Sequence, residues 1–206
     1  MPNPNWDNPW GILTGEGQVD YLVVEPLADD PNRGTFYWEP NKGIAQQSSK
    51  AHFPNAGGID VKDNELFVVS KRYQTVFVLD LDQGTYHNSS TATSLFDGEP
   101  DQIQRLVPTD DDPDADRILY FTEDGDGKGA KAGIHGRNSN GHYFTIVESH
   151  VYSDETTGLA FSPDGRHLYV AYQESGLLFD IFRDDGQPFS ANALHVKHHR
   201  AGATAE

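Results

Sequence analysis

Short apolar runs alternate with polar turn residues over most of this chain. The runs are rich in aromatic and β-branched residues, and each is closed by Gly, Pro, Asp or Asn, as is typical of β-strands joined by tight turns. The clearest runs are residues 58–61, 65–70, 75–81, 118–122, 142–147, 158–161, 167–172 and 177–182. The pattern therefore predicts an all-β fold.

The order of these runs repeats along the chain. Residues 58–84 comprise a strand, a turn, a second strand, a turn and a third strand that ends in an acidic turn, and residues 158–186 have the same order. A looser copy lies between them, in residues 101–122. The spacing of about 45–55 residues is in the range of four-stranded propeller blades. The sequence thus predicts a partial or small β-propeller of about three to four blades.

The same pattern divides the chain into parts. Residues 1–34 form an N-terminal loop-rich segment with one strand, residues 35–190 hold the β-propeller blades, and residues 191–206 form a C-terminal tail. Residues 40–56 read as a polar loop, and a fourth blade is expected from residues 19–39 and 187–196. An open part of a propeller exposes blade edges, so pairing of such an edge with a strand of another chain is a further expectation.

Charge narrows the choice of partners. The chain has 32 acidic and 15 basic residues and a formal net charge of −17, a field that repels phosphate backbones and anionic lipids. Neither a nucleic acid nor a membrane is therefore expected as a partner. A divalent cation such as calcium is the natural counterpart, because calcium takes roughly six to eight oxygen ligands.

Cysteine and leader segments add little. The absence of cysteine excludes disulfides, a cysteine nucleophile and a zinc–thiolate site. The first residues show no basic and apolar stretch of the kind found in signal peptides, and localisation stays undetermined on this ground.

Four carboxylates are the candidate metal ligands. Glu123 and Asp124 follow a strand and precede a glycine-rich turn, whereas Glu155 precedes the strand at 158–161. Asp101 is assigned the place in the middle copy that matches Glu155. Such positions lie at the mouths of loops and face the central channel, where propeller ligands and metals gather. A flexible hairpin tip is the alternative for the turn after Glu123, and a carboxylate bonded to nearby amides is the alternative for Glu155.

No catalytic residue emerges from the remaining motifs. The chain has no G-x-S-x-G, so a nucleophile elbow is not expected. The acidic run at 109–116 does not fit an EF-hand, because Arg117 stands where the sharp turn needs glycine.

Several stretches resemble the later blades of the PhoX-type alkaline phosphatase family, over roughly residues 34–190. The most specific are LYFTEDG at 119–125 and ETTGLAFSPDG at 155–165, supported by FPNAGGI at 53–59 and EPDQ at 99–102. The resemblance implies an extracellular or cell-surface propeller that uses calcium, together with iron, to cleave phosphomonoesters. It implies metal ligands at Glu123, Glu155 and Asp101.

The chain also departs from that family. Gly57 stands where relatives commonly carry a glutamate, and the earlier blades have no counterpart. The resemblance therefore implies an incomplete or degenerate calcium-dependent phosphomonoester hydrolase. Two alternatives are a non-catalytic acidic propeller that binds calcium or a protein partner, and a propeller lactonase or esterase.

Overall fold

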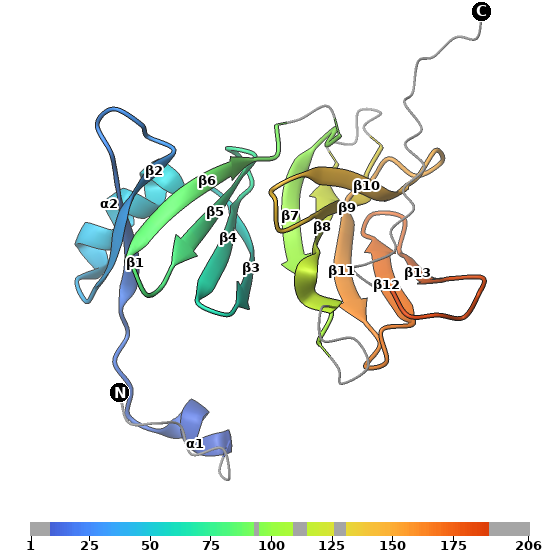
Figure 1. The fold of residues 1–206 in the computed structure, drawn as a ribbon, viewed down its shortest axis with the longest axis horizontal. Coiled ribbons are helices and arrows are strands. Elements are labelled where there is room, and N and C mark those ends of the chain that lie inside the picture. The colour runs from blue at the N-terminus through green and yellow to red at the C-terminus, as the bar shows by residue number, and fades with distance from the viewer. Residues whose placement is uncertain (1–8, 93–94, 109–114, 126–130, 190–206) are drawn as a thin grey trace, which may run out of the picture.

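The computed structural model describes residues 9–92, 95–108, 115–125 and 131–189 (Figure 1). Within these residues the chain forms three antiparallel sheets, two short α-helices and one 3₁₀ turn. None of the described helices is long and apolar enough to cross a membrane. The predicted all-β fold class is confirmed.

Each sheet contains a meander in which consecutive strands are neighbours. The first meander is β3 (Ala56–Lys62), β4 (Glu65–Ser70), β5 (Thr75–Asp80) and β6 (Thr85–Ser90). The second is β7 (Glu99–Gln104), β8 (Leu119–Asp124), β9 (Gly133–Arg137) and β10 (Tyr143–Glu148), with the 3₁₀ turn Ala115–Arg117 before β8. The third is β11 (Thr156–Phe161), β12 (His167–Tyr172) and β13 (Leu177–Phe182).

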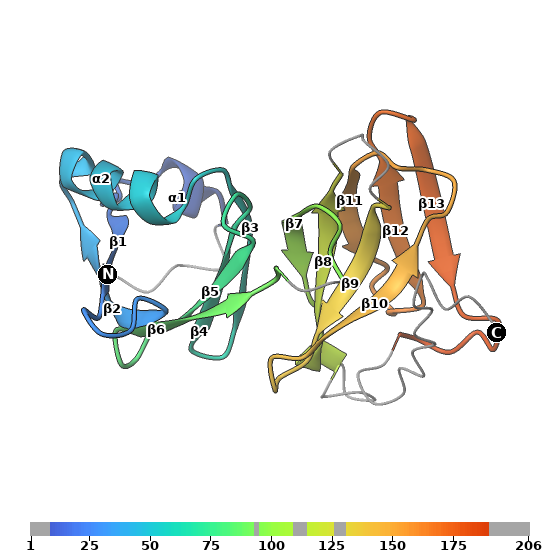
Figure 2. The same ribbon diagram turned by 90° about the horizontal axis from the view of Figure 1, so that it is seen from above.

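The first strands of the three meanders lie next to one another. Strand β7 contacts β3 on one side and β11 on the other, so the sheets follow each other around a common inner side (Figures 1 and 2). This arrangement of antiparallel meanders is that of propeller blades. The chain is a partial β-propeller, as the repeat predicted.

The N-terminal strands do not form the expected fourth blade. Strands β1 (Tyr21–Pro26) and β2 (Arg33–Glu39) make a hairpin whose second strand pairs with β6, and the first sheet thereby grows to six strands. The expectation of a blade from residues 19–39 is wrong, because this hairpin finds a free edge on an existing blade. Residues 190–196, the rest of that expected blade, and the tail at 191–206 lie outside the described residues.

The sequence predicted a loop over residues 40–56. The structure instead has a helix there, α2 (Lys42–His52). The Asn41 side chain caps this helix by accepting a hydrogen bond of 2.9 Å from the Gly43 amide. Only Ala45 of α2 is buried, so the helix has no apolar stripe that the sequence could reveal. A shorter helix, α1 (Pro9–Thr14), lies near the N-terminus.

The core lies between the sheets. One cluster of buried side chains joins β4 and β5 to β7 and β8 and includes Val69, Val76, Leu119 and Phe121, all fully buried. A second cluster joins the second sheet to the third and includes Tyr120, Leu168 and Val170. Each blade therefore depends on its neighbour to bury its apolar face.

The three innermost strands share an irregularity. The pairing register shifts between Ala56 and Ile59 in β3, between Pro100 and Ile103 in β7, and between Thr157 and Ala160 in β11. Gly57, Asp101 and Gly158 fall at equivalent places inside these shifts. Such bulges turn a side chain away from the regular alternation of a strand.

The outer side of β13 is an edge within the described residues, because the third sheet ends there. Leu178 and Phe182 on this strand are exposed. Pairing of this edge with another chain stays a prediction.

The contact between the first two blades requires glycine at position 58. A Cβ atom there would lie 2.4 Å from the Ile103 amide nitrogen and 2.9 Å from the Gln102 carbonyl carbon. We expect Gly58→Ala to lower the free energy of unfolding by about 1–3 kcal/mol, because β3 and β7 must separate. Urea unfolding followed by tryptophan fluorescence measures this. Gly17→Ala is the control, since a Cβ there meets nothing within 4 Å. Equal stability of both variants would contradict this packing.

Candidate functional site

Lys71 lies in the turn between β4 and β5 and reaches across to the second sheet. Its Nζ lies 2.7 Å from Asp124 Oδ2, at the end of β8, and 3.2 Å from Asp101 Oδ1, inside the β7 bulge. The Lys71 and Asp101 side chains are only 16% and 13% exposed. Water therefore screens these ion pairs less than it would at an open surface.

Glu155, just before β11, adds a third carboxylate to this group. Its pKa is raised from 4.5 to about 7, first by burial and then by the negative charge of Asp124. Asp101 raises the Glu155 pKa further through its charge and a hydrogen bond, and Lys71 opposes the rise. We call Asp101, Asp124, Glu155 and Lys71 the carboxylate cluster. Its residues come from all three sheets or the segments that precede their strands.

Lys71 itself stays charged in this setting. Burial alone lowers the Lys71 pKa, but hydrogen bonds to Asp124 and Asp101, and the charges of both groups, outweigh it and raise the pKa. The cluster therefore carries a net charge near −1 while Glu155 is protonated and near −2 once Glu155 is ionised.

Gly57 lies against this cluster. A Cβ atom at position 57 would lie 2.8 Å from the Asp101 carbonyl oxygen, 3.1 Å from Lys71 Cγ and 3.2 Å from Asp101 Oδ1. A side chain there would displace the groups that form the ion pair. The glycine at position 57 therefore leaves room for the contact between Lys71 and Asp101.

Glu123 is placed differently from what the sequence suggested. It lies within β8 rather than at a loop mouth, and its side chain is fully buried. Its carboxylate accepts hydrogen bonds from the Gly98 amide at 2.6 Å and the Gly133 amide at 3.0 Å, and lies 3.0 Å from His135 Nε2. Each carboxylate oxygen thus has a partner within β9 or the segment before β7.

His135 completes this buried pair and was not identified from the sequence. Its Nδ1 lies 3.2 Å from Thr145 Oγ1, and the Phe96 ring lies 4.1 Å from the imidazole, centroid to centroid. Thr156 ties the third sheet to the same region, because its hydroxyl accepts a hydrogen bond of 2.8 Å from the Glu123 amide. A lone histidine in an apolar strand gives no signal of such a partner.

The structure therefore brings together three of the four candidate ligands, Asp101, Asp124 and Glu155, and keeps Glu123 in a separate buried pair. The match between Asp101 and Glu155 in the repeat is wrong, because the strand register aligns Asp101 with Gly57 and Gly158. Lys71 was overlooked as a member, since a single lysine after a strand has no distinctive spacing.

The cluster suits a hard cation in the chemistry of its donors, since all are carboxylate oxygens. In the conformation described, with Lys71 between the carboxylates, no group of three or more His, Cys, Asp or Glu in the described residues is arranged to hold a metal ion. Binding a metal here would therefore require these side chains, Lys71 included, to rearrange.

Comparisons with known proteins support little beyond the class of fold. No family model matches the chain, and no curated protein matches it. The resemblance to PhoX-type alkaline phosphatases thus rests on the sequence motifs alone.

Two solved structures are similar over part of the chain. A glucose dehydrogenase has 14% identity and a TM-score of 0.42, with 58% of this chain and 38% of that one covered. Regucalcin from Agrobacterium tumefaciens strain C58, described as a calcium-binding protein, has 13% identity and a TM-score of 0.37, with 65% and 56% covered. The chain thus spans less than two thirds of either protein, and likenesses this weak carry no argument about activity.

The raised pKa of Glu155 predicts how stability changes with pH. A carboxyl whose pKa is higher in the folded state contributes stability below its unfolded pKa of 4.5, and this contribution is lost as the pH rises to about 7. We expect Glu155→Gln to match the wild type near pH 4.5 and to exceed its stability by about 1 kcal/mol at pH 8, since the carboxyl is only partly buried. Urea unfolding across this range measures the difference. Glu16→Gln, at an exposed glutamate, should leave the dependence of stability on pH unchanged. If Glu155→Gln also left it unchanged, the interaction of Glu155 with Asp124 and Asp101 would be contradicted.

Proposed function

We propose that this chain is a non-catalytic propeller module that binds a divalent cation, calcium, through Asp101, Asp124 and Glu155. The observation that supports this is the contact of two carboxylates, Asp101 and Asp124, with the ammonium group of Lys71. Glu155 lies close enough for the charges of both carboxylates to raise its pKa. In this proposal Lys71 is the resident counter-ion, and the cation displaces it.

Charge and side-chain chemistry favour such an exchange. A divalent cation carries two positive charges, and its attraction to carboxylates is stronger in a partly buried site than at an open surface. The lysine ammonium sits on a flexible four-carbon stem, so it can leave without any change in the backbone. The protein's net charge of −17 also raises the local concentration of cations.

Hydrolysis of a phosphomonoester, or of a lactone or ester, is the alternative that the sequence raised. A calcium ion bound here would supply Lewis-acid polarisation of a substrate oxygen. The resemblance also implied iron, for which imidazole is a suitable ligand. No histidine belongs to the cluster, and His135 is committed to Glu123. The binding function is therefore the one that the described geometry supports best.

Replacement of Lys71 tests the exchange directly. We expect Lys71→Met to bind calcium about tenfold or more tightly than the wild type, because the competing ammonium is gone. We expect Asp101→Asn to weaken binding by a similar factor. Isothermal titration with calcium measures both, and Asp29→Asn, at an exposed carboxylate, is the charge-matched control.

The thermal midpoint gives an independent readout. Without calcium, Lys71→Met leaves repelling carboxylates and should melt below the wild type, and calcium should restore the midpoint by mass action. Failure of both proteins to bind calcium would mean that the cluster is only an ion pair between blades.

Turnover assays separate binding from catalysis. We expect the calcium-loaded chain to leave p-nitrophenyl phosphate and a panel of lactones unhydrolysed, because the proposed site has a binding role only. Hydrolysis that a calcium chelator abolishes, and that Asp101→Asn also removes, would contradict the non-catalytic proposal. Loss of chelator-sensitive hydrolysis in Asp101→Asn but not in Asp29→Asn would place the activity at this cluster.

A further inference from the structure

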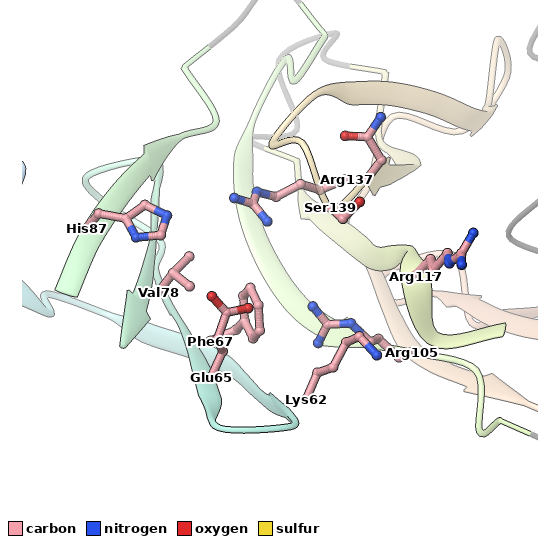
Figure 3. A pocket seen from close by; sticks show the side chains of 10 residues that line it. Lys62, Glu65, Phe67, Val78, His87, Arg105, Arg117, Arg137 and Ser139 are labelled. Atoms are coloured by element: carbon pink, nitrogen blue, oxygen red, sulfur yellow. The ribbon is translucent and has the colours of Figure 1, made fainter. Parts of the chain in front are cut away.

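A second polar site lies at the other end of the same inner strands. A cavity of about 100 Å³ opens between the first and second sheets (Figure 3). It is lined by Lys62, Arg105, Arg117, Arg137, His87 and Glu65, together with the apolar Phe67 and Val78 and the polar Asn138 and Ser139. Lys62 is five residues from Gly57 along β3, roughly 17 Å at about 3.3 Å per residue. This basic pocket is therefore distinct from the carboxylate cluster.

The concentration of positive charge is unusual for this protein. The chain has only 15 Lys and Arg residues among 206, against 32 Asp and Glu. Four of these cations line one small cavity, with Glu65 as the single carboxylate among its lining residues.

Arg137, at the end of β9, has no carboxylate partner among the described residues. It is 8% exposed, and its Nε donates a hydrogen bond of 3.2 Å to Ser89 Oγ. Its guanidinium carbon lies 5.9 Å from the centroid of the Phe67 ring. Figure 3 shows the side chain directed from the second sheet toward the cavity. A buried guanidinium without a counter-ion is unfavourable, so an anion beside it would be stabilising.

Arg105 supplies a second hydrogen-bond donor that faces no acceptor in the described part of the chain. Its guanidinium pairs with Asp60 through Nη1 and lies over Phe67, 4.2 Å from the ring centroid. Its Nε is buried and has no hydrogen-bond partner among the described residues. Buried polar atoms are nearly always paired, and an orphaned donor at the wall of a cavity points to a missing acceptor.

Of Lys62, Arg105 and Arg137, only Arg137 lacks a carboxylate partner among the described residues. Asp60 offsets Arg105, and Asp116 offsets Lys62. The pKa of His87 is lowered, first by burial and then by the charge of Arg137, so this imidazole is mostly neutral at pH 7. Glu65 is the group that opposes an anion here.

We propose that the basic pocket binds a small oxyanion of the phosphate class, with Arg137 and the Arg105 Nε as donors. Guanidinium groups match such oxyanions because their planar forks donate paired hydrogen bonds. The volume corresponds to about three water molecules, which suits a single phosphate group rather than a nucleoside. The phosphate group belongs either to inorganic phosphate or to a small phosphate ester.

Titration with inorganic phosphate at low ionic strength, in calcium-free buffer, tests this pocket. We expect Arg137→Gln to weaken phosphate binding about tenfold or more, because it removes a charge-assisted pair of hydrogen bonds. Arg72→Gln makes the same charge change at an exposed turn and should shift the affinity less than about twofold. Glu65→Gln should strengthen binding several-fold, since it removes the opposing charge. Equal losses in Arg137→Gln and Arg72→Gln would overturn the proposal, as would no binding by the wild type.

An NMR measurement on the wild type tests the same pocket without relying on a variant that fails to fold. Phosphate bound to Arg137 offsets the charge that lowers the pKa of His87, so the His87 imidazole signals in NMR spectra should move and its pKa should rise. The exposed His150 is the internal control. Movement of both histidines alike would mean general ionic screening and would overturn the pocket.

Two further experiments identify the source of the phosphate group and test whether the two sites are independent. Binding of glycerol phosphate as tight as that of inorganic phosphate would assign the pocket to esters, and its exclusion would assign it to the free ion. Lys71→Met should bind phosphate like the wild type, because the carboxylate cluster lies at the other strand end. A failure of calcium binding would therefore leave this proposal standing, and the reverse also holds.

Discussion

The close approach of the innermost strands is the constraint on which this structure depends. Gly58 lies so near the backbone of Ile103 that no side chain fits between β3 and β7, and the apolar cluster of the first two blades closes over this contact. Two of the apolar clusters lie between neighbouring blades, so these clusters depend on the contact between the inner strands. The inner strands β3, β7 and β11 also share a register shift, at Gly57, Asp101 and Gly158, so each is bulged at the same place.

Carboxylates gather at one end of these inner strands, and arginines gather at the other. At one end, Lys71 lies between Asp101 and Asp124, with Glu155 nearby, so one lysine ammonium lies where these carboxylates meet. At the other end, Arg105 and Arg137 stack near one phenylalanine ring in a cavity where cations outnumber carboxylates. The two ends suit ligands of opposite charge, a divalent cation and an oxyanion, for the same electrostatic reason.

The strands and their repeat could be predicted because alternation and turn residues are local properties. The same reasoning missed helix α2, since its stability comes from a cap and one buried alanine rather than from an apolar stripe. It also misplaced the hairpin of β1 and β2, because pairing with β6 depends on which edge is free. Among the candidate ligands, Asp101, Asp124 and Glu155 lie together, whereas the buried partners of Glu123 lie on β9 and before β7, where no spacing rule connects them.

The sequence by itself determined the fold class, the boundaries of most strands and the acidic residues that are candidate ligands, since each of these follows from neighbours along the chain. Only the tertiary structure decided which charges meet. Lys71 and Asp101 are 30 residues apart in the sequence, whereas Lys71 Nζ lies 3.2 Å from Asp101 Oδ1. Arg137 reaches the cavity beside Phe67 from a different sheet. Such contacts depend on how bulged strands stack, which no local pattern encodes.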